Sequence, residues 1–187
     1  MLIKEQEEMI SRTLFTESKK LRIFDFDDTL VKTTSYIRIS HSNGKISTLT
    51  PGEYAVYKEK PGDVFDYSDF QTVNNPEEIK KITTVLRRIV QSSGSDKVYI
   101  LTARAAYKPI KKYIEDIGIN SKKIFVVALA SNNPQDKADW IEDKIDNDGY
   151  DDIYFADDSI KNVDATKKML RTKDVKWRVQ HLSLIHI

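Results

Sequence analysis

The stretch Phe24-Asp25-Phe26-Asp27-Asp28-Thr29-Leu30 decides how the rest of the chain is interpreted. An apolar run that begins at Leu21 ends there in three carboxylates and a hydroxyl. Side chains alternate along an extended backbone, so Asp25 and Asp27 are expected on one face and the two phenylalanines on the other. Crowded carboxylates repel each other and lose solvation when they are buried, so a cation or a shared proton is expected between them.

Two such carboxylates suit the transfer of a phosphoryl group. One can attack phosphorus and form an aspartyl-phosphate, while the other protonates the leaving oxygen and later takes a proton from water. Hard oxygen ligands with room for water favour Mg²⁺ as the cation that screens these charges. A structural acidic turn after a strand is the alternative that this stretch leaves open.

The composition restricts the class of protein. A length of 187 residues fits one domain with a modest insertion. The formal net charge is +1, which gives no overall attraction to nucleic acid or membrane. The absence of cysteine excludes disulfides, thiolate zinc sites and a cysteine nucleophile, and is typical of cytoplasmic proteins. The sequence has neither an apolar signal region at its start nor an apolar run that could span a bilayer, so we expect a cytoplasmic protein without a membrane partner.

The last six residues, 182–187, read LSLIHI and match one reading frame of a transposase adapter used in sequencing libraries. We therefore expect an adapter-derived tail on a metagenomic reading frame, with a single domain in residues 1–181. A genuine short apolar tail is the alternative, and the codons of the coding DNA distinguish the two.

The hydrophobic pattern predicts strands alternating with helices. The strands are expected at residues 21–26, 98–101, 124–129, 153–156 and 175–179. The helices are expected at residues 4–18, from a capped start at 75–78 onward, around 110–117, after Asn133-Pro134, and after a capping Ser159. This alternation predicts an α/β fold, in which helices cover both faces of a central five-stranded parallel sheet.

An insertion at residues 31–75 interrupts the alternation after the first strand. Two strand-like segments flank Asn43-Gly44, which predicts a β-hairpin flap, and Thr50-Pro51 predicts a short helix after it. The aromatic residues of the insertion are expected to form a small core under the flap, with stacking on a base or ring as the alternative: Phe65, Tyr67 and Phe70. His41, beside the turn, is expected to be solvated.

Polar residues end four of the predicted strands or begin the helix that follows: Asp25, Asp27, Thr102, Lys137, Asp157 and Asp158. Their order resembles the haloacid dehalogenase (HAD) superfamily, with DxDx(T/V), a strand ending in Ser or Thr, a Lys, and a strand ending in paired acids. The segments FDFDDTL, ILTAR and FADDS carry this resemblance, which spans roughly residues 20 to 180. It implies a HAD-like Rossmannoid three-layer sandwich, with the insertion as a minimal cap.

The resemblance also implies roles for the acids. Asp25 would be the nucleophile and a Mg²⁺ ligand, and Asp27 would be the acid/base, with its backbone carbonyl on the metal. Asp158 would bind the metal directly, and Asp157 would act on the metal site indirectly, without touching the ion. Asn162 stands where many relatives have an acid, which implies a weaker water-mediated contact with the metal.

The same resemblance places the phosphate of the substrate. Thr102, with the backbone at Ala103 and Arg104, would hold its oxygens, and Lys137 would neutralise the nucleophile and the transferring group. Lys108 and Lys111 are alternatives for that lysine.

The chain further resembles the phosphatase half of polynucleotide kinase/phosphatase enzymes and small phage-encoded members of the superfamily. That resemblance implies a phosphomonoester hydrolase for nucleic-acid ends or nucleotides, while the absence of GxxxxGK(S/T) leaves no kinase half. The nearly neutral charge balance argues against a polymer. A small phosphoester or phosphoprotein substrate and a non-catalytic phosphate-binding module remain as alternatives.

Overall fold

The structure is a computed structural model that describes residues 18–54, 57–92, 94 and 96–182. The helix expected at residues 4–18 and the expected adapter tail at 182–187 therefore lie outside the described residues, apart from Ser18 and Leu182. Among the residues that are described, no helix is both long and apolar enough to cross a bilayer.

Five parallel strands form the central sheet in the order β10-β9-β1-β7-β8. Their bounds are β1 Lys20–Phe24, β7 Lys97–Thr102, β8 Ile124–Ala128, β9 Asp152–Asp157 and β10 Lys176–His181. The first strand lies in the middle, and all five carboxyl ends meet at one edge of the sheet. The predicted α/β fold with a five-stranded parallel sheet is confirmed.

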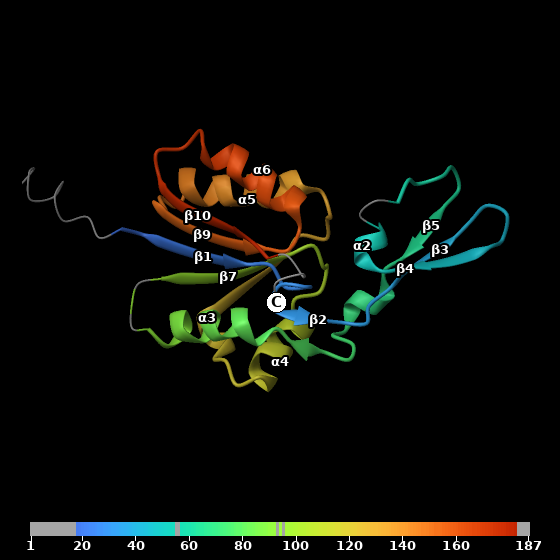
Figure 1. Ribbon diagram of the computed structural model, residues 1–187, viewed down its shortest axis with the longest axis horizontal. Coiled ribbons are helices and arrows are strands. Elements are labelled where there is room, and N and C mark those ends of the chain that lie inside the picture. Colours follow the sequence, from blue (N-terminus) through green and yellow to red (C-terminus); the bar gives the residue numbers. More distant parts are fainter. Residues whose placement is uncertain (1–17, 55–56, 93, 95, 183–187) are drawn as a thin grey trace, which may run out of the picture.

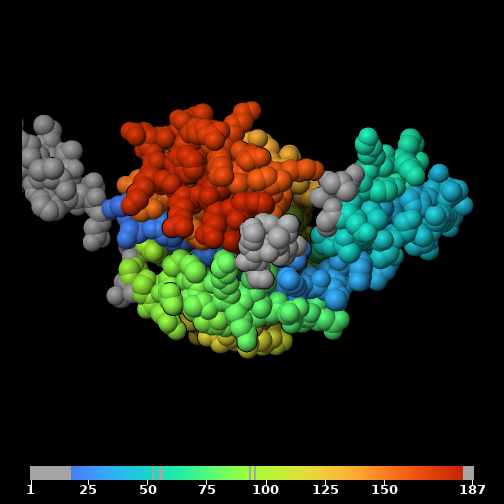
Figure 2. All heavy atoms as spheres, viewed as in Figure 1, coloured from blue at the N-terminus to red at the C-terminus, as the bar shows by residue number. Residues whose placement is uncertain are grey.

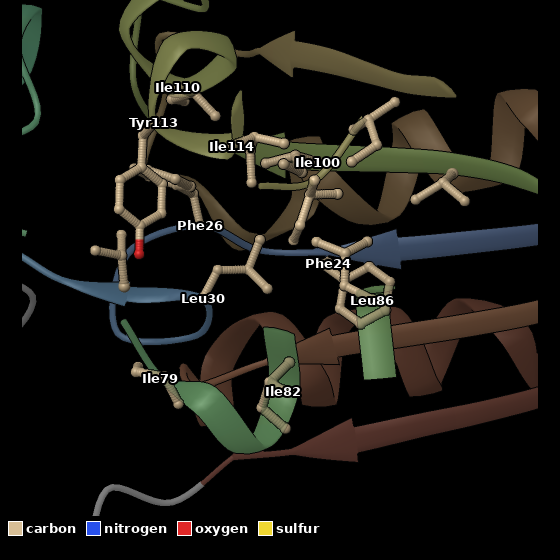
Figure 3. Close-up of a cluster of buried hydrophobic side chains, with 14 of the residues drawn as sticks. Phe24, Phe26, Leu30, Ile79, Ile82, Leu86, Ile100, Ile110, Tyr113 and Ile114 are labelled. Atoms are coloured by element: carbon tan, nitrogen blue, oxygen red, sulfur yellow. The ribbon is translucent and has the colours of Figure 1, made fainter. Parts of the chain in front are cut away.

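Helices cover both faces of this sheet (Figure 1). They are α3 Lys80–Gln91 and α4 Lys108–Asp116 on one face, and α5 Pro134–Asp146 and α6 Ile160–Leu170 on the other, with a short 3₁₀ turn, η2 Ser121–Lys123, before β8. Strand β1 alternates between the two cores. Phe24 packs with α3 and α4 (Figure 3), whereas Leu21 and Ile23 pack with α5 and α6. These layers make the predicted three-layer sandwich.

The helix starts that position the site follow local sequence signals in part. The Asn133 side chain accepts from the amide of Gln135, and Pro134 takes the first position of α5, as predicted. Ser159 does precede α6, but its side chain makes no capping hydrogen bond, so that detail of the prediction is wrong.

The insertion forms a small sheet of its own, which we call the flap (residues 31–75). Its strands are β3 Ile37–Ser40, β4 Ile46–Leu49 and β5 Val64–Asp66, with the helix α2 Pro51–Tyr54 and the 3₁₀ turn η1 Ser68–Gln71. The hairpin prediction is confirmed, since β3 and β4 pair antiparallel around Gly44, whose φ is +77°. Strand β5, on the other edge of β3, was not predicted.

The flap extends away from the body of the molecule (Figures 1 and 2). Phe65 packs against the rings of Tyr54, Tyr57 and Tyr67, with centroids 5.5 to 6.3 Å apart, so Phe65 and Tyr67 join a small aromatic cluster in the flap, as expected. The expectation is wrong for Phe70, whose ring lies against the Arg104 guanidinium instead. The expectation for His41 is wrong, because its side chain is only 13% exposed and is hydrogen-bonded on both ring nitrogens.

The root of the flap is closed by a second short pairing, between β2 Val31–Lys32 and β6 Glu77–Glu78. The prediction of a helix start at residues 75–78 is therefore wrong, and α3 begins only at Lys80. A local capping pattern was overridden there by the backbone partners that β2 offers.

Candidate active site

The predicted acids do meet at the carboxyl edge of the sheet. Strand β1 ends at Phe24, and the next residue, Asp25, donates its amide to the carbonyl of Ala156 in β9 at 2.9 Å. This bond holds the start of the acidic loop against the end of β9, where Asp157 and Asp158 lie. The Asp25 side chain is 9% exposed.

Lys137 lies between two of these acids. It stands in the first turn of α5, and its Nζ donates to Asp25 Oδ1 at 2.6 Å and to Asp157 Oδ2 at 2.8 Å. Its side chain is 4% exposed, so the ammonium is withdrawn from water. Lys137, rather than Lys108 or Lys111, therefore supplies the positive charge at Asp25.

Asp157 and Asp158 differ in what occupies their oxygens. Asp157 accepts hydrogen bonds from Lys137, from the amide of Ser159 and from the Asn162 side chain, which reaches both carboxylate oxygens. For the Asp158 carboxylate, the donor that the described residues show is its own backbone amide. Asp157 is thus held by the protein, while Asp158 keeps its oxygens for another ligand.

The acids outnumber the ammonium. Asp25, Asp157 and Asp158 each offer an oxygen within 4.8 Å of the others. Burial, with the charges of Asp157 and Asp28, raises the pKa of Asp158 to about 7. Burial also raises the pKa of Asp25, although Lys137 opposes it.

A lysine alone does not balance this cluster. Burial would lower the pKa of Lys137, but attraction to Asp25 and Asp157 outweighs burial and raises it, so Lys137 stays charged. Its single charge leaves a net negative cluster of hard oxygen ligands. Such a donor set fits a divalent cation of the Mg²⁺ kind.

Asp27 points to a different partner. Arg104 donates to both of its carboxylate oxygens, through Nε at 2.8 Å and Nη2 at 2.7 Å. The same guanidinium donates to the carbonyls of Phe70 and Thr72 at the flap root and lies near the rings of Phe26 and Phe70. Arg104 therefore ties Asp27 to the flap.

The remaining predicted residues follow β7. Thr102 is buried, and its hydroxyl accepts from the amide of Arg104 at 3.2 Å, while Ala103 is exposed. The Arg104 side chain is 1% exposed and its hydrogen bonds go to the protein, which indicates that it positions Asp27. In the sequence, the only signal for the contact between Arg104 and Asp27 was the position of Arg104 shortly after Thr102.

No protein-family model matches the chain, and no curated protein matches its sequence. Solved structures do match its shape. The HAD domain of the effector protein Lem4 from Legionella pneumophila, as an inactive mutant, superposes with a TM-score of 0.56 over 89% of this chain and 87% of that one, at 14% identity. The chain has the haloacid dehalogenase fold.

Two further solved structures match the fold of this chain. A chain of the Pnkp1/Rnl/Hen1 RNA repair complex matches with a TM-score of 0.51 at 15% identity, over 91% of this chain and 45% of that one. The effector Ceg4 from Legionella pneumophila matches with a TM-score of 0.52 at 14% identity, over 90% of each chain. At these identities the likeness shows the fold, so the HAD chemistry must be argued from the site.

Proposed function

We propose that the protein is a Mg²⁺-dependent phosphomonoester hydrolase that works through an aspartyl-phosphate on Asp25. The observation that carries this proposal is the buried Lys137, which bridges Asp25 and Asp157 beside the free carboxylate of Asp158. A structural acidic turn and an ordinary surface lysine would both leave unexplained a buried ammonium bonded to two carboxylates with a third carboxylate beside them.

Asp25 is the nucleophile in this proposal. One Asp25 oxygen bonds to Lys137, which orients the carboxylate and lowers the repulsion that an incoming phosphate meets. The Thr102 hydroxyl and the backbone at Ala103 hold phosphate oxygens. Asp27 donates a proton to the leaving oxygen and then takes one from the water that hydrolyses the intermediate.

The cation would be held by Asp25, Asp158 and the backbone carbonyl of Asp27. Asp157 would not touch the cation but would position the site through its hydrogen bonds with Lys137 and Asn162. When it is bound, Mg²⁺ supplies charge that offsets the carboxylates and the phosphate. Among the described residues, more donors reach the Asp157 carboxylate than the Asp158 carboxylate, which supports this division between the two neighbouring acids.

The substrate class that we propose is a phosphate on a nucleic-acid end or a nucleotide. Two observations support it: the flap stands out as an arm (Figure 2), and the fold matches a chain of an RNA repair complex. A small phosphoester or phosphoprotein substrate, or phosphate binding without turnover, is a distinct outcome of the test.

The test is phosphate release from 3′- and 5′-phosphorylated oligonucleotides, mononucleotides, a phosphopeptide and an aryl phosphate, with Mg²⁺ or with EDTA. We expect Mg²⁺-dependent release, fastest from the oligonucleotides. Fastest release from another substrate would overturn the nucleic-acid assignment alone. No release from any of them, in a folded protein that binds Mg²⁺, would overturn the hydrolase and favour a binding module.

A further inference from the structure

A second cluster of reactive side chains lies in the flap, apart from the acidic site. Ser47 Oγ is 2.8 Å from Nε2 of His41, and Nδ1 of the same ring is 2.7 Å from Asp63 Oδ1. Serine, imidazole and carboxylate thus form one chain of hydrogen bonds. The flap topology builds it, because β3 leads into His41, β4 carries Ser47 and β5 follows Asp63.

Asp63, the carboxylate of this hydrogen-bond chain, is held in its charged form. Asp63 also accepts from the Tyr57 hydroxyl at 2.7 Å and from the amide of Lys60 at 3.0 Å, and its side chain is 2% exposed. Despite burial, these bonds and the one from His41 lower the pKa of Asp63 to about 2.

An ionised Asp63 dictates the tautomer of the ring. Its carboxylate accepts only, so Nδ1 of a neutral His41 must carry the hydrogen, and the lone pair of Nε2 is left to accept from Ser47. Nε2 is thereby placed to take the proton of the serine hydroxyl. This is the arrangement that activates a serine nucleophile.

Space and charge for a ligand adjoin the three residues. A hollow of about 290 Å³ is lined by all of them and by polar neighbours: Ser42, Asn43, Lys45, Tyr57 and Lys60. Its volume is at the lower end of the range of small-molecule sites. Lys45 and Lys60 bring positive charge to the lining of this hollow, and such charge would stabilise an oxyanion formed there.

We propose that Ser47, His41 and Asp63 form a second, metal-independent site that transfers short acyl groups from esters. Ser47 Oγ bonds to the carbonyl carbon as its proton passes to His41 Nε2. The leaving alkoxide takes that proton and departs as an alcohol, which leaves an acyl-serine. Water then gives a proton to His41 and displaces the acyl group as a carboxylic acid, and Ser47 regains its hydrogen.

The test uses a fluorophosphonate probe on the full chain in EDTA, with the labelled peptides identified by mass spectrometry. Trypsin separates Ser47, the only serine of residues 46–58, from residues 39–45, in which fragment ions distinguish Ser42 from Ser40. The two serines of the hollow, Ser47 and Ser42, are thus compared within one protein. We expect Ser47 to be labelled about 100-fold faster than Ser42, the low end of what general-base catalysis supplies. Urea should abolish the difference.

Variants separate an activated serine from a merely accessible one. His41→Gln should slow the labelling of Ser47 about 100-fold. Ser40→Ala, which removes an exposed serine of β3 outside the lining of the hollow, should leave it unchanged. Labelling of Ser47 at the rate of Ser42, or equally fast labelling in urea, would overturn the proposal in the unmutated protein, even if His41→Gln fails to fold. The hydrogen-bond chain would then only brace the flap.

Discussion

Asn162 shows how one residue changes the balance of the acidic site. It donates to both oxygens of Asp157, at 3.1 and 3.0 Å. A carboxylate at this position would repel Asp157 instead of holding it. The asparagine thus fixes Asp157 against Lys137 and leaves Asp158 as the carboxylate that is free for a cation.

Asp25 and Asp27, in the loop after β1, should carry out the phosphoryl transfer. We expect Asp25→Asn to abolish phosphate release, because the amide is not a nucleophile, and Asp27→Asn to lower kcat about 10²- to 10⁴-fold through loss of proton transfer. Phosphate release is the measurement, with folding checked by circular dichroism. Asp116→Asn, which removes an exposed carboxylate from α4, is the matched control. Turnover near that of the control in either variant would contradict the mechanism.

Asp158 should make the stability of the metal-free protein depend on pH. Its pKa rises from an ordinary value of 3.8 to about 7 in the fold, so the folded state holds a proton that the unfolded state has lost between these values. The contribution of this Asp158 proton to the free energy of unfolding is fully present below about pH 4 and is lost as pH rises through about 7.

Urea unfolding in EDTA at pH 5 and pH 8 measures this dependence. The free energy of unfolding of the wild type, relative to Asp158→Asn, should fall by about 1 kcal/mol or more between the two values. At pH 8, Mg²⁺ should stabilise the wild type more than the variant, because the free carboxylate is a proposed ligand. A parallel pH dependence in both proteins would show that Asp158 ionises without penalty.

Among the elements, the central sheet was predictable and the flap root was not. Runs such as Val98–Leu101 and Ile153–Ala156 are strands because long apolar segments fit a buried parallel sheet, and the structure extends them by only one or two residues. Strand β6 was missed because Asn75-Pro76-Glu77-Glu78 has a helix-capping pattern, and only the distant partner β2 makes it a strand.

The candidate active site likewise has a part that the sequence predicted and a part that it did not. Asp25, Lys137, Asp157 and Asp158 follow strand ends or begin a helix, and a parallel sheet brings such positions together. The pairing of Arg104 with Asp27 depends on where the flap root places its carbonyls, and the contact of His41 with Asp63 depends on the unforeseen β5. The local sequence pattern around these residues predicts neither of these two contacts.

Arg104 joins two elements, the β7 loop and the flap root, and we expect it to position Asp27. Arg104→Lys keeps the charge but cannot hold both carboxylate oxygens and the flap carbonyls in one plane. Steady-state kinetics should show kcat lowered about 10- to 100-fold with KM little changed, as for a misplaced catalytic group.

Arg87→Lys is the matched control for Arg104→Lys, because Arg87 also joins a carboxylate, Glu78, to a backbone carbonyl, that of Ile117. Its contacts are with Glu78 and Ile117 and not with Asp27, so Arg87→Lys should leave kcat unchanged. A raised KM with an unchanged kcat in Arg104→Lys would instead indicate that Arg104 binds the substrate.

The end of β10 contributes to the body through Leu182. This residue is 5% exposed within the core that contains Phe24, and its amide donates to the carbonyl of Asp157 at 2.9 Å. Leu182→Ala should therefore lower the free energy of unfolding by about 2 to 5 kcal/mol. The expected adapter-derived segment, 182–187, includes this buried Leu182, so the test of its origin is confined to residues 183–187. Their removal is expected to have no effect if they are adapter-derived, and chemical denaturation compares the two changes. A large loss on removing 183–187 would contradict the expected origin of the tail.

For the whole molecule, the body and the flap have separate cores. The two large clusters of the body contain no residue from 32–72, whereas Ile37, Ile39 and the aromatics around Phe65 belong to the flap. The ends of the flap sheet lie close together, since the Tyr36 amide donates to Asp69 at 3.1 Å and that of Thr34 to the Asn74 carbonyl at 3.1 Å. A short linker can therefore replace the flap sheet without stretching the root.

We expect replacement of residues 37–67 by a Gly-Ser-Gly linker to leave a folded body, because no contact of Arg104 and no core residue of the body is removed. Circular dichroism should show one cooperative thermal transition. Mg²⁺-dependent release from an aryl phosphate should persist, because the acids and Lys137 stay in place. Any preference for oligonucleotide ends should fall, since the arm beside the site is gone. Loss of aryl phosphate turnover in a folded variant would contradict this division and show that the flap sheet itself completes the catalytic site.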